Sequence, residues 1–208
     1  MTAREFLVIS AIGPDRPGLI AELTGFIAQR GCNIEESRAV VLAGQFGFMF
    51  VVSGAPPHIV AVMQELDDLE MQAGLNAVAR RIPDPRAAAS AAGFTRRYSI
   101  SANALDREGI VHAIADVVRS HDANILELET STYSGSESGV PLFHLELTVG
   151  MRERDGSAER LAHALDDLAR EENIDVEMRP TGPEARATDV GAAIPRVTDG
   201  SIIGEARA

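Results

Sequence analysis

The sequence contains no lysine, and all 19 of its basic residues are arginine. This absence excludes lysine Schiff-base chemistry and with it the usual covalent mechanism of pyridoxal-phosphate enzymes. It also excludes the phosphate-binding loop of nucleotide hydrolases, which needs a lysine. The formal net charge is −12. Because phosphate contacts dominate affinity for nucleic acid, an acidic chain without a basic cluster disfavours direct DNA binding.

Cysteine is almost as scarce, and long hydrophobic runs are missing. The single cysteine, Cys32, excludes an internal disulfide and every multi-cysteine metal site. No window reaches the run of about 20 apolar residues that a membrane helix needs. The segment Met1–Phe6 leads directly into an apolar strand pattern and lacks a signal-peptide layout. We therefore expect a soluble globular protein of the cytoplasm.

One motif is present twice. Asp15-Arg16-Pro17-Gly18 returns as Asp106-Arg107-Glu108-Gly109, at an offset of 91 residues. The same offset carries Asn33-Ile34 onto Asn124-Ile125. Two short motifs in register at one offset predict two copies of one structural unit.

Apolar periodicity predicts the same order of elements in both halves: strand, helix, strand, strand, helix, strand. This order predicts an α+β chain of two ferredoxin-like βαββαβ units, each a four-stranded antiparallel sheet with two helices on one face. The opposite face of each sheet would then be covered by another unit, of this chain or of another. We expect strands at 6–12, 33–42, 46–52 and 75–82 and helices at 18–30 and between Pro57 and Gly74, and in the second half strands at 96–104, 124–130, 142–149 and 174–178 and helices near 110–118 and 161–168.

The two predicted domains span residues 1–83 and 96–180. An alanine- and proline-containing linker at 84–95 joins them, and residues 181–208 form an extended or disordered tail.

The repeated motif lies where a strand gives way to a helix. Asp15 and Asp106 could accept hydrogen bonds from the N–H groups of the first helical turn, and Pro17 suits that turn because it has no N–H. An exposed helix start also favours an anionic group. Two interpretations stay open: a ligand site, or a capped helix that binds nothing.

With the repeat and the element order established, both halves resemble ACT domains, the small regulatory modules that bind amino acids. Asp15-Arg16-Pro17-Gly18 before the first helix and Cys32-Asn33-Ile34 at the second strand resemble the glycine cleavage system transcriptional repressor family. This resemblance implies two ACT domains without a DNA-binding domain, a glycine-like ligand, a partner transcription regulator and a homodimer. It implies no cofactor.

In ACT domains, ligand sites lie at interfaces between domains and use the first loop, the start of the first helix and the start of the second strand. The resemblance therefore implies two sets of ligand-binding residues. Glu108 replaces Pro17 in the second copy, and its carboxylate would repel a ligand carboxylate. The residues are Asp15, Arg16, Gly18, Leu19, Asn33 and Ile34, with counterparts Asp106, Arg107, Gly109, Ile110, Asn124 and Ile125.

Catalytic and metal-binding interpretations have little support. His112 and Asp116 are four residues apart on a predicted helix, but no third metal ligand accompanies them, so we expect a solvent-facing pair. Cys32 is expected to be a lone buried thiol. Formyltetrahydrofolate deformylases carry a similar N-terminal module, but here a second ACT-like unit stands where their hydrolase domain follows. We therefore predict a protein that is not an enzyme.

Two functions remain. The first is a sensor whose affinity for a partner changes when an amino acid binds, which needs a coupling of only about 1–3 kcal/mol. The second is a constitutive interaction scaffold or allosteric subunit that has lost ligand binding.

Overall fold

The computed structural model describes residues 4–87, 93–134, 139–152 and 156–181. The chain divides into two compact units, Met1–Gly93 (unit 1) and Phe94–Ala208 (unit 2), each considered by itself. The expected tail beyond Thr181 and part of the expected linker lie outside the described residues.

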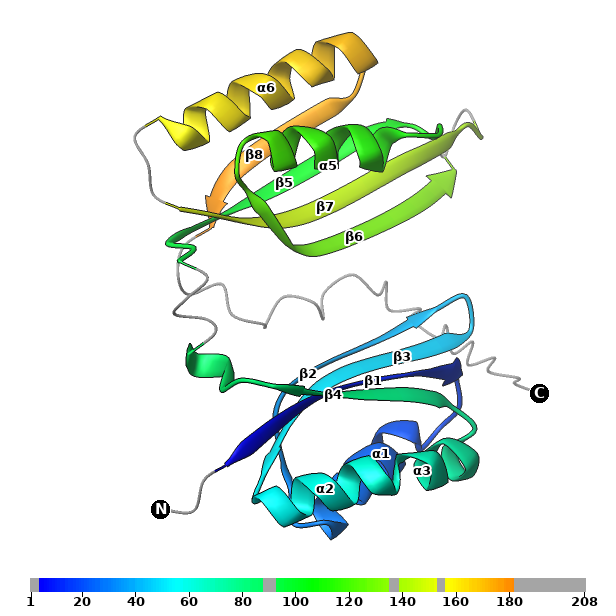
Figure 1. Cartoon of the computed structure of the whole chain (residues 1–208). Coiled ribbons are helices and arrows are strands. Elements are labelled where there is room, and N and C mark those ends of the chain that lie inside the picture. Colours follow the sequence, from blue (N-terminus) through cyan, green and yellow to red (C-terminus); the bar gives the residue numbers. More distant parts are fainter. Residues whose placement is uncertain (1–3, 88–92, 135–138, 153–155, 182–208) are drawn as a thin grey trace, which may run out of the picture. The chain divides into compact units, whose positions relative to one another are not determined.

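Unit 1 is a four-stranded antiparallel sheet with helices on one face (Figure 1). The strand order is β2-β3-β1-β4, so the first strand lies in the interior of the sheet and both crossovers carry helices. This confirms the expected fold class. Its elements are β1 (Glu5–Pro14), α1 (Leu19–Gln29), β2 (Asn33–Leu42), β3 (Gln45–Gly54), α2 (Pro56–Gln64), α3 (Leu66–Ala73) and β4 (Asn76–Ile82).

Unit 2 repeats this topology with the strand order β6-β7-β5-β8. Even an irregularity is repeated: the register of the edge strand shifts between Ile34 and Glu36 in unit 1 and between Ile125 and Glu127 in unit 2. No helix in the described ranges is long and apolar enough to cross a membrane. The elements of unit 2 are β5 (Arg96–Leu105), α5 (Ile110–Ser120), β6 (Asn124–Ser134), β7 (Pro141–Met151), α6 (Ser157–Glu172) and β8 (Asp175–Thr181).

The core of each unit lies between the sheet and its helices. Side chains of β1 and β3 alternate between this core and the opposite face, as the two-residue period of a strand requires. In unit 1, Phe48 and Phe50 stack with ring centroids 4.5 Å apart beneath the helices. Residues that fill the two cores include Leu7, Ile9, Leu23, Ile27, Val52, Ile59 and Val62 in unit 1, and Ile100, Ile110, Ile114, Leu145, Val149, Leu161 and Leu165 in unit 2.

The second helix of unit 1 differs from the expectation. The sequence pattern predicts one helix, but the structure divides it into α2 and α3 at Glu65, whose backbone has φ −102° and ψ 15°. Hydrogen bonds continue across the break, from Glu65 N–H to Ala61 O at 3.1 Å and from Leu69 N–H to Glu65 O at 3.3 Å. Met63, expected on the buried side of the helix, is 39% exposed, while Leu66 and Leu69 are buried.

The start of the first helix also differs from the expectation. The N-cap residue is Gly18 in unit 1 and Gly109 in unit 2, and neither helix has a side-chain cap. The predicted capping by Asp15 and Asp106 is therefore wrong. Pro17 precedes the helix instead of lying in its first turn. Both glycines have positive φ, +94° and +89°, and this backbone conformation forms the tight turn that the motif contains.

Candidate ligand site at the strand–helix turn

The turn between β1 and α1 leaves backbone donors free. Since α1 has no side-chain cap, N–H groups of its first turn have no partner within the helix. Such groups, together with the positive end of the helix dipole, favour a bound anion. The turn between β5 and α5 has the same geometry around Gly109.

A pocket of about 310 Å³ opens beside the turn of unit 1. Asp15, Arg16 and Gly18 form its polar side. The edge strand β2 and the start of β3 form an apolar wall opposite the turn. The wall residues are Ala39, Val40, Val41 and Phe46.

The aspartates of the motif keep their carboxylates available. The backbone N–H of Asp15 donates to Gly44 O at 2.9 Å, and that of Asp106 donates to Pro141 O at 3.0 Å, which extends the β ladder by one bond. Both residues are exposed. Their carboxylates form no hydrogen bond or ion pair within the described ranges, so an ammonium group could pair with either one.

The arginines of the motif are engaged within the fold. Arg16 donates to both carboxylate oxygens of Glu22, at 2.7 and 2.6 Å, and to Ala73 O at the end of α3, at 3.1 Å. The hydrogen bond from Arg16 holds the pKa of the Glu22 carboxyl below its ordinary value. In unit 2, Arg107 donates to Glu172 O at 3.2 Å and to the carboxylate of the same residue at 2.6 Å. Each arginine thus ties its turn to the C-terminal end of the second helix, where a cation is favourable.

The hydrophobic residues of the expected ligand set are part of the two cores. Leu19 and Ile110 are each 2% exposed, so only their backbone N–H groups can face a ligand. Ile34 and Ile125 are half-buried and pack against their cores.

Asn33 does not lie beside the turn. It pairs with Ser53, which in turn pairs with Phe6, so it lies at the start of β1, whereas Asp15 follows the end of β1. The eight steps along the strand from Phe6 to Pro14 separate these ends by about 27 Å. Asn124 occupies the same place in unit 2, opposite Gly150. One unit therefore does not bring the asparagine and the turn to a common ligand.

A network of charges surrounds Asn33. Its amide donates to Glu35 Oε1 at 3.2 Å, and the fully buried Ser53 hydroxyl donates to the same oxygen. The hydrogen bond from Ser53, followed by that from Asn33, holds the pKa of the Glu35 carboxyl below its ordinary value, against the opposing effect of burial. A pocket of about 530 Å³ lies next to Glu35. Its charged lining residues are Arg4, Glu5, Glu35, Arg81, Asp84 and Arg86.

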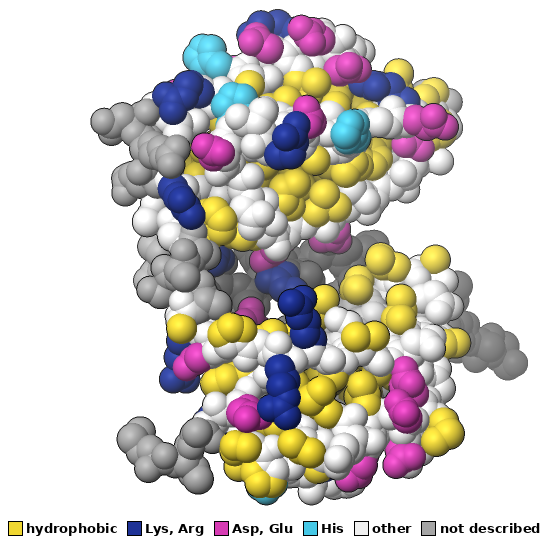
Figure 2. Space-filling model, in the orientation of Figure 1, with side chains coloured by type: hydrophobic (Ala, Val, Ile, Leu, Met, Phe, Trp, Pro, Cys, Tyr) yellow, Lys and Arg dark blue, Asp and Glu magenta, His cyan; other side chains and the backbone are white. Residues whose placement is uncertain are grey.

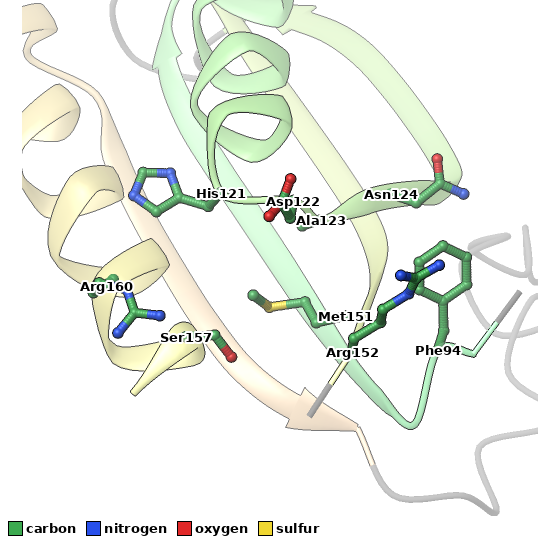
Figure 3. Close-up of a pocket in the computed structure, with 9 residues that line it drawn as sticks. All are labelled: Phe94, His121, Asp122, Ala123, Asn124, Met151, Arg152, Ser157 and Arg160. Atoms are coloured by element: carbon green, nitrogen blue, oxygen red, sulfur yellow. The ribbon is translucent and has the colours of Figure 1, made fainter. Parts of the chain in front are cut away.

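Unit 2 contains a further pocket, of about 440 Å³, at the corresponding end of its sheet. In Figure 3, His121 and Asp122 lie above Met151, while Ser157 and Arg160 of α6 lie to one side and Arg152 lies beside Phe94. Counted back from the left-handed residues Gly74 and Asn173 that end the second helices, Ser157 takes the place of His58. In unit 1 that histidine ring approaches the chain, with Nδ1 3.3 Å from Gly31 O. Asn124, one of the expected ligand residues, lines this pocket, but the sequence did not indicate its other residues, since they come from four separate segments.

The residues considered for metal or nucleophilic chemistry have other surroundings. Asp116 accepts two hydrogen bonds from Arg119, at 2.6 and 3.1 Å, which lower the pKa of its carboxyl. Burial raises the pKa of the half-buried Cys32 thiol, which opposes formation of a reactive thiolate. No group of three potential metal ligands occurs in the described part of the chain.

Comparison with known proteins shows similarity to a family model and to two curated relatives. Residues 5–79 match the family model described as an ACT domain. The glycine cleavage system transcriptional repressors of Escherichia coli (strain K12) and Shigella flexneri are each 26% identical over 151 residues, which is 71% of this chain and 76% of theirs.

Solved structures agree over a larger share of the chain. An unknown protein from Galdieria sulphuraria aligns with a TM-score of 0.69 and 26% identity, covering 86% of this chain and all of that one. A protein provisionally assigned as a glycine cleavage system transcriptional repressor aligns with a TM-score of 0.65 and 22% identity, covering 86% and 99%. Unit 2 repeats the topology of the matched ACT domain. Unit 1 therefore matches the ACT-domain model over residues 5–79, and the chain as a whole resembles the glycine cleavage system transcriptional repressors.

Proposed function

We propose that this chain is a non-catalytic regulatory protein that binds a small amino acid at the turn after the first strand of its ACT domains. Binding would control amino-acid or one-carbon metabolism through a partner transcription regulator. The names of the relatives at 26% identity support the regulatory role. The turn geometry supports the choice of ligand.

The observation that carries the proposal is the pairing of free donors with a free carboxylate. An amino acid has a carboxylate, which suits the uncapped start of α1, and an ammonium group, which suits Asp15. Gly18 has no Cβ, so a ligand can approach the backbone there. The pocket of about 310 Å³ has room for a small amino acid and presents one apolar wall to it.

The two units should differ in affinity. In unit 1 the first turn of α1 contains Glu22, but Arg16 pairs with its carboxylate. In unit 2, Glu108 adds an exposed carboxylate beside the start of α5, while Arg107 pairs with Glu172 instead. The extra negative charge opposes a ligand carboxylate, so we propose that unit 1 binds more tightly.

Calorimetric titration of the full chain with glycine and a panel of small amino acids tests the proposal. We expect saturable heat from the wild type, a loss of tight binding in Asp15→Asn and a smaller effect in Asp106→Asn. Asp68→Asn, which changes an exposed acid on α3, is the matched control. Equal binding by wild type and Asp15→Asn would place the ligand elsewhere, and no binding by the wild type would favour the constitutive scaffold.

A further inference from the structure

The face of the unit 1 sheet that points away from the helices, its open face, exposes several large apolar side chains. Ile12, Met49, Val78 and Val40 are between 50% and 70% exposed on this face. Val8 and Val51 lie next to Met49 and Val78 along the strands and are half-buried. Figure 2 shows hydrophobic side chains reaching the surface of this unit. An exposed apolar patch of this kind indicates an interaction surface.

The same face in unit 2 is polar, which makes unit 2 an internal reference. In unit 1, Ser10 pairs with Met49 on one side and Val78 on the other. In unit 2, the matching Ser101 pairs with Glu146 and Glu177. Ile12 is likewise matched by Asn103. Since both units have the same fold, the fold does not require the apolar residues of unit 1.

Two charges on the open face of unit 1, Glu36 and Arg80, form a self-complementary row, and a third, Arg38, lies at the next level beside Met49. Glu36 pairs with Val51, Val51 with Val8, and Val8 with Arg80, so one level of the sheet reads acid, valine, valine, base. Glu36 and Arg80 lie on opposite edge strands, three strand spacings or about 14 Å apart. They therefore cannot form an ion pair with each other within one unit.

If two copies are related by a two-fold axis parallel to the strands, the row of one copy is complementary in charge to the row of the other. Such an axis places β2 of one copy over β4 of the other, so Glu36 of each copy faces Arg80 of the other at the same level. The valines of the two rows meet in the middle. Sheets that pack face to face with roughly aligned strands have the geometry of a β-sandwich core.

The available area suits a dimer. Four strands of up to ten residues present about 600 Å² per copy. This value is at the lower end of specific interfaces, which bury about 600–1,000 Å² on each partner. We propose that the open face of unit 1 is the dimerisation surface of this protein and that a second copy occupies it about a two-fold axis parallel to the strands.

The first test measures the mass of the full chain by light scattering or sedimentation over a range of concentrations. We expect the wild type to have twice the 22.2 kDa mass of the chain. Val78→Glu and Met49→Glu introduce the residue that unit 2 has at each position and should raise the dimer dissociation constant about 100-fold or more. Met71→Glu is the control, because Met71 is 76% exposed but lies on α3, away from the sheet.

The second test is charge exchange across the axis. Glu36→Arg and Arg80→Glu should each weaken the dimer, and the double variant should restore it, since each new acid then faces a new base. The distance between the two residues excludes rescue within one unit. A monomeric wild type, a dimer that survives Val78→Glu, or a double variant weaker than both single variants would each overturn the proposal.

Discussion

At Gly18 the absence of a side chain has a measurable effect on stability. Its φ of +94° lies in a region that L-residues rarely adopt, and Gly109 repeats the conformation in unit 2. We expect Gly18→Ala to lower the free energy of unfolding by about 1–2 kcal/mol, because a Cβ is disfavoured in this conformation. Chemical denaturation measures the loss.

Gly25 is the matched control for this prediction. It lies in the interior of α1, and an added Cβ would meet no atom within 4 Å. Gly25→Ala should therefore stabilise the protein by about 0.5–1 kcal/mol, since alanine loses less conformational entropy in a helix. If Gly18→Ala were as stable as Gly25→Ala, the turn would not depend on glycine.

Ser53 and Glu35 form a pair whose contribution to stability depends on pH. Because the pKa of the folded Glu35 carboxyl is lowered, the interaction stabilises the protein above the pKa of an unfolded glutamate and is lost as the pH falls through the folded value. At pH 7, Ser53→Ala should cost about 1.5 kcal/mol, the low end for a hydrogen bond to a charged group, because Glu35 is exposed.

A pH series of denaturation curves tests this prediction. The difference between wild type and Ser53→Ala should shrink in acid, once Glu35 is protonated. Thr24→Ala removes a hydroxyl that donates to the backbone Ile20 O at 2.7 Å, and it should have an effect that does not change with pH. A difference for Ser53→Ala that is constant in acid would assign its role to packing alone.

At the scale of elements, the sequence predicted the strands and helices because their apolar periods are clear. It did not predict the break at Glu65, since Ile59, Val62, Leu66 and Leu69 keep a helical spacing across it. The carboxylate of Glu65 pairs with Arg30, 35 residues earlier. The spacing of apolar residues within one helix cannot predict a contact between residues so far apart in the sequence.

The partners of the motif arginines, Arg16 and Arg107, were likewise not predicted from the sequence. The resemblance to ACT domains implied ligand binding for Arg16, and the structure gives it a partner at Ala73 O, at the end of α3. We expect Arg16→Met to increase amide hydrogen exchange at the end of α3 and in the turn. Arg170→Met, which removes an exposed pair with Asp167 on α6, should leave the exchange of these segments unchanged. Unaltered exchange in Arg16→Met would show that the arginine does not hold the two segments together.

The position of Asn33 follows from topology and could have been predicted. A strand–helix crossover returns the chain to the end of the sheet where the first strand began, so a residue that opens β2 lies far from the turn that ends β1. The resemblance to ACT sites implied that Asn33 and the turn after β1 contact the same ligand. The connectivity of the strands places them at opposite ends of the sheet within one unit.

Replacing Asn33 therefore tests how many units form the site. We expect Asn33→Ala to retain amino-acid binding at the Asp15 turn, because the side chain is engaged with Glu35 at the other end of the sheet. Titration of the folded variant beside Asp15→Asn provides the measurement. Loss of binding in both would mean that a turn from one unit and an asparagine from another meet at the ligand.

At the scale of the whole molecule, the repeat offset predicted two copies of one fold, because conserved spacing survives divergence of side chains. The contrast between the two open faces was not predicted. It depends on the register of β4 and β8, which sets Val78 opposite Ser10 and Glu177 opposite Ser101. Hydrophobic patterns give the face on which a strand residue lies, but not its neighbour on the next strand.

The acidic open face of unit 2 limits the number of other copies that one chain can bind. If both units of a tandem repeat had a self-associating sheet face, each chain could bind two others and form an open-ended polymer. Unit 2 has Glu146 and Glu177 where unit 1 has Met49 and Val78, so of the two open sheet faces only that of unit 1 suits the proposed dimer. Association through a single self-complementary face closes at two copies, so duplication of the unit need not lead to fibres.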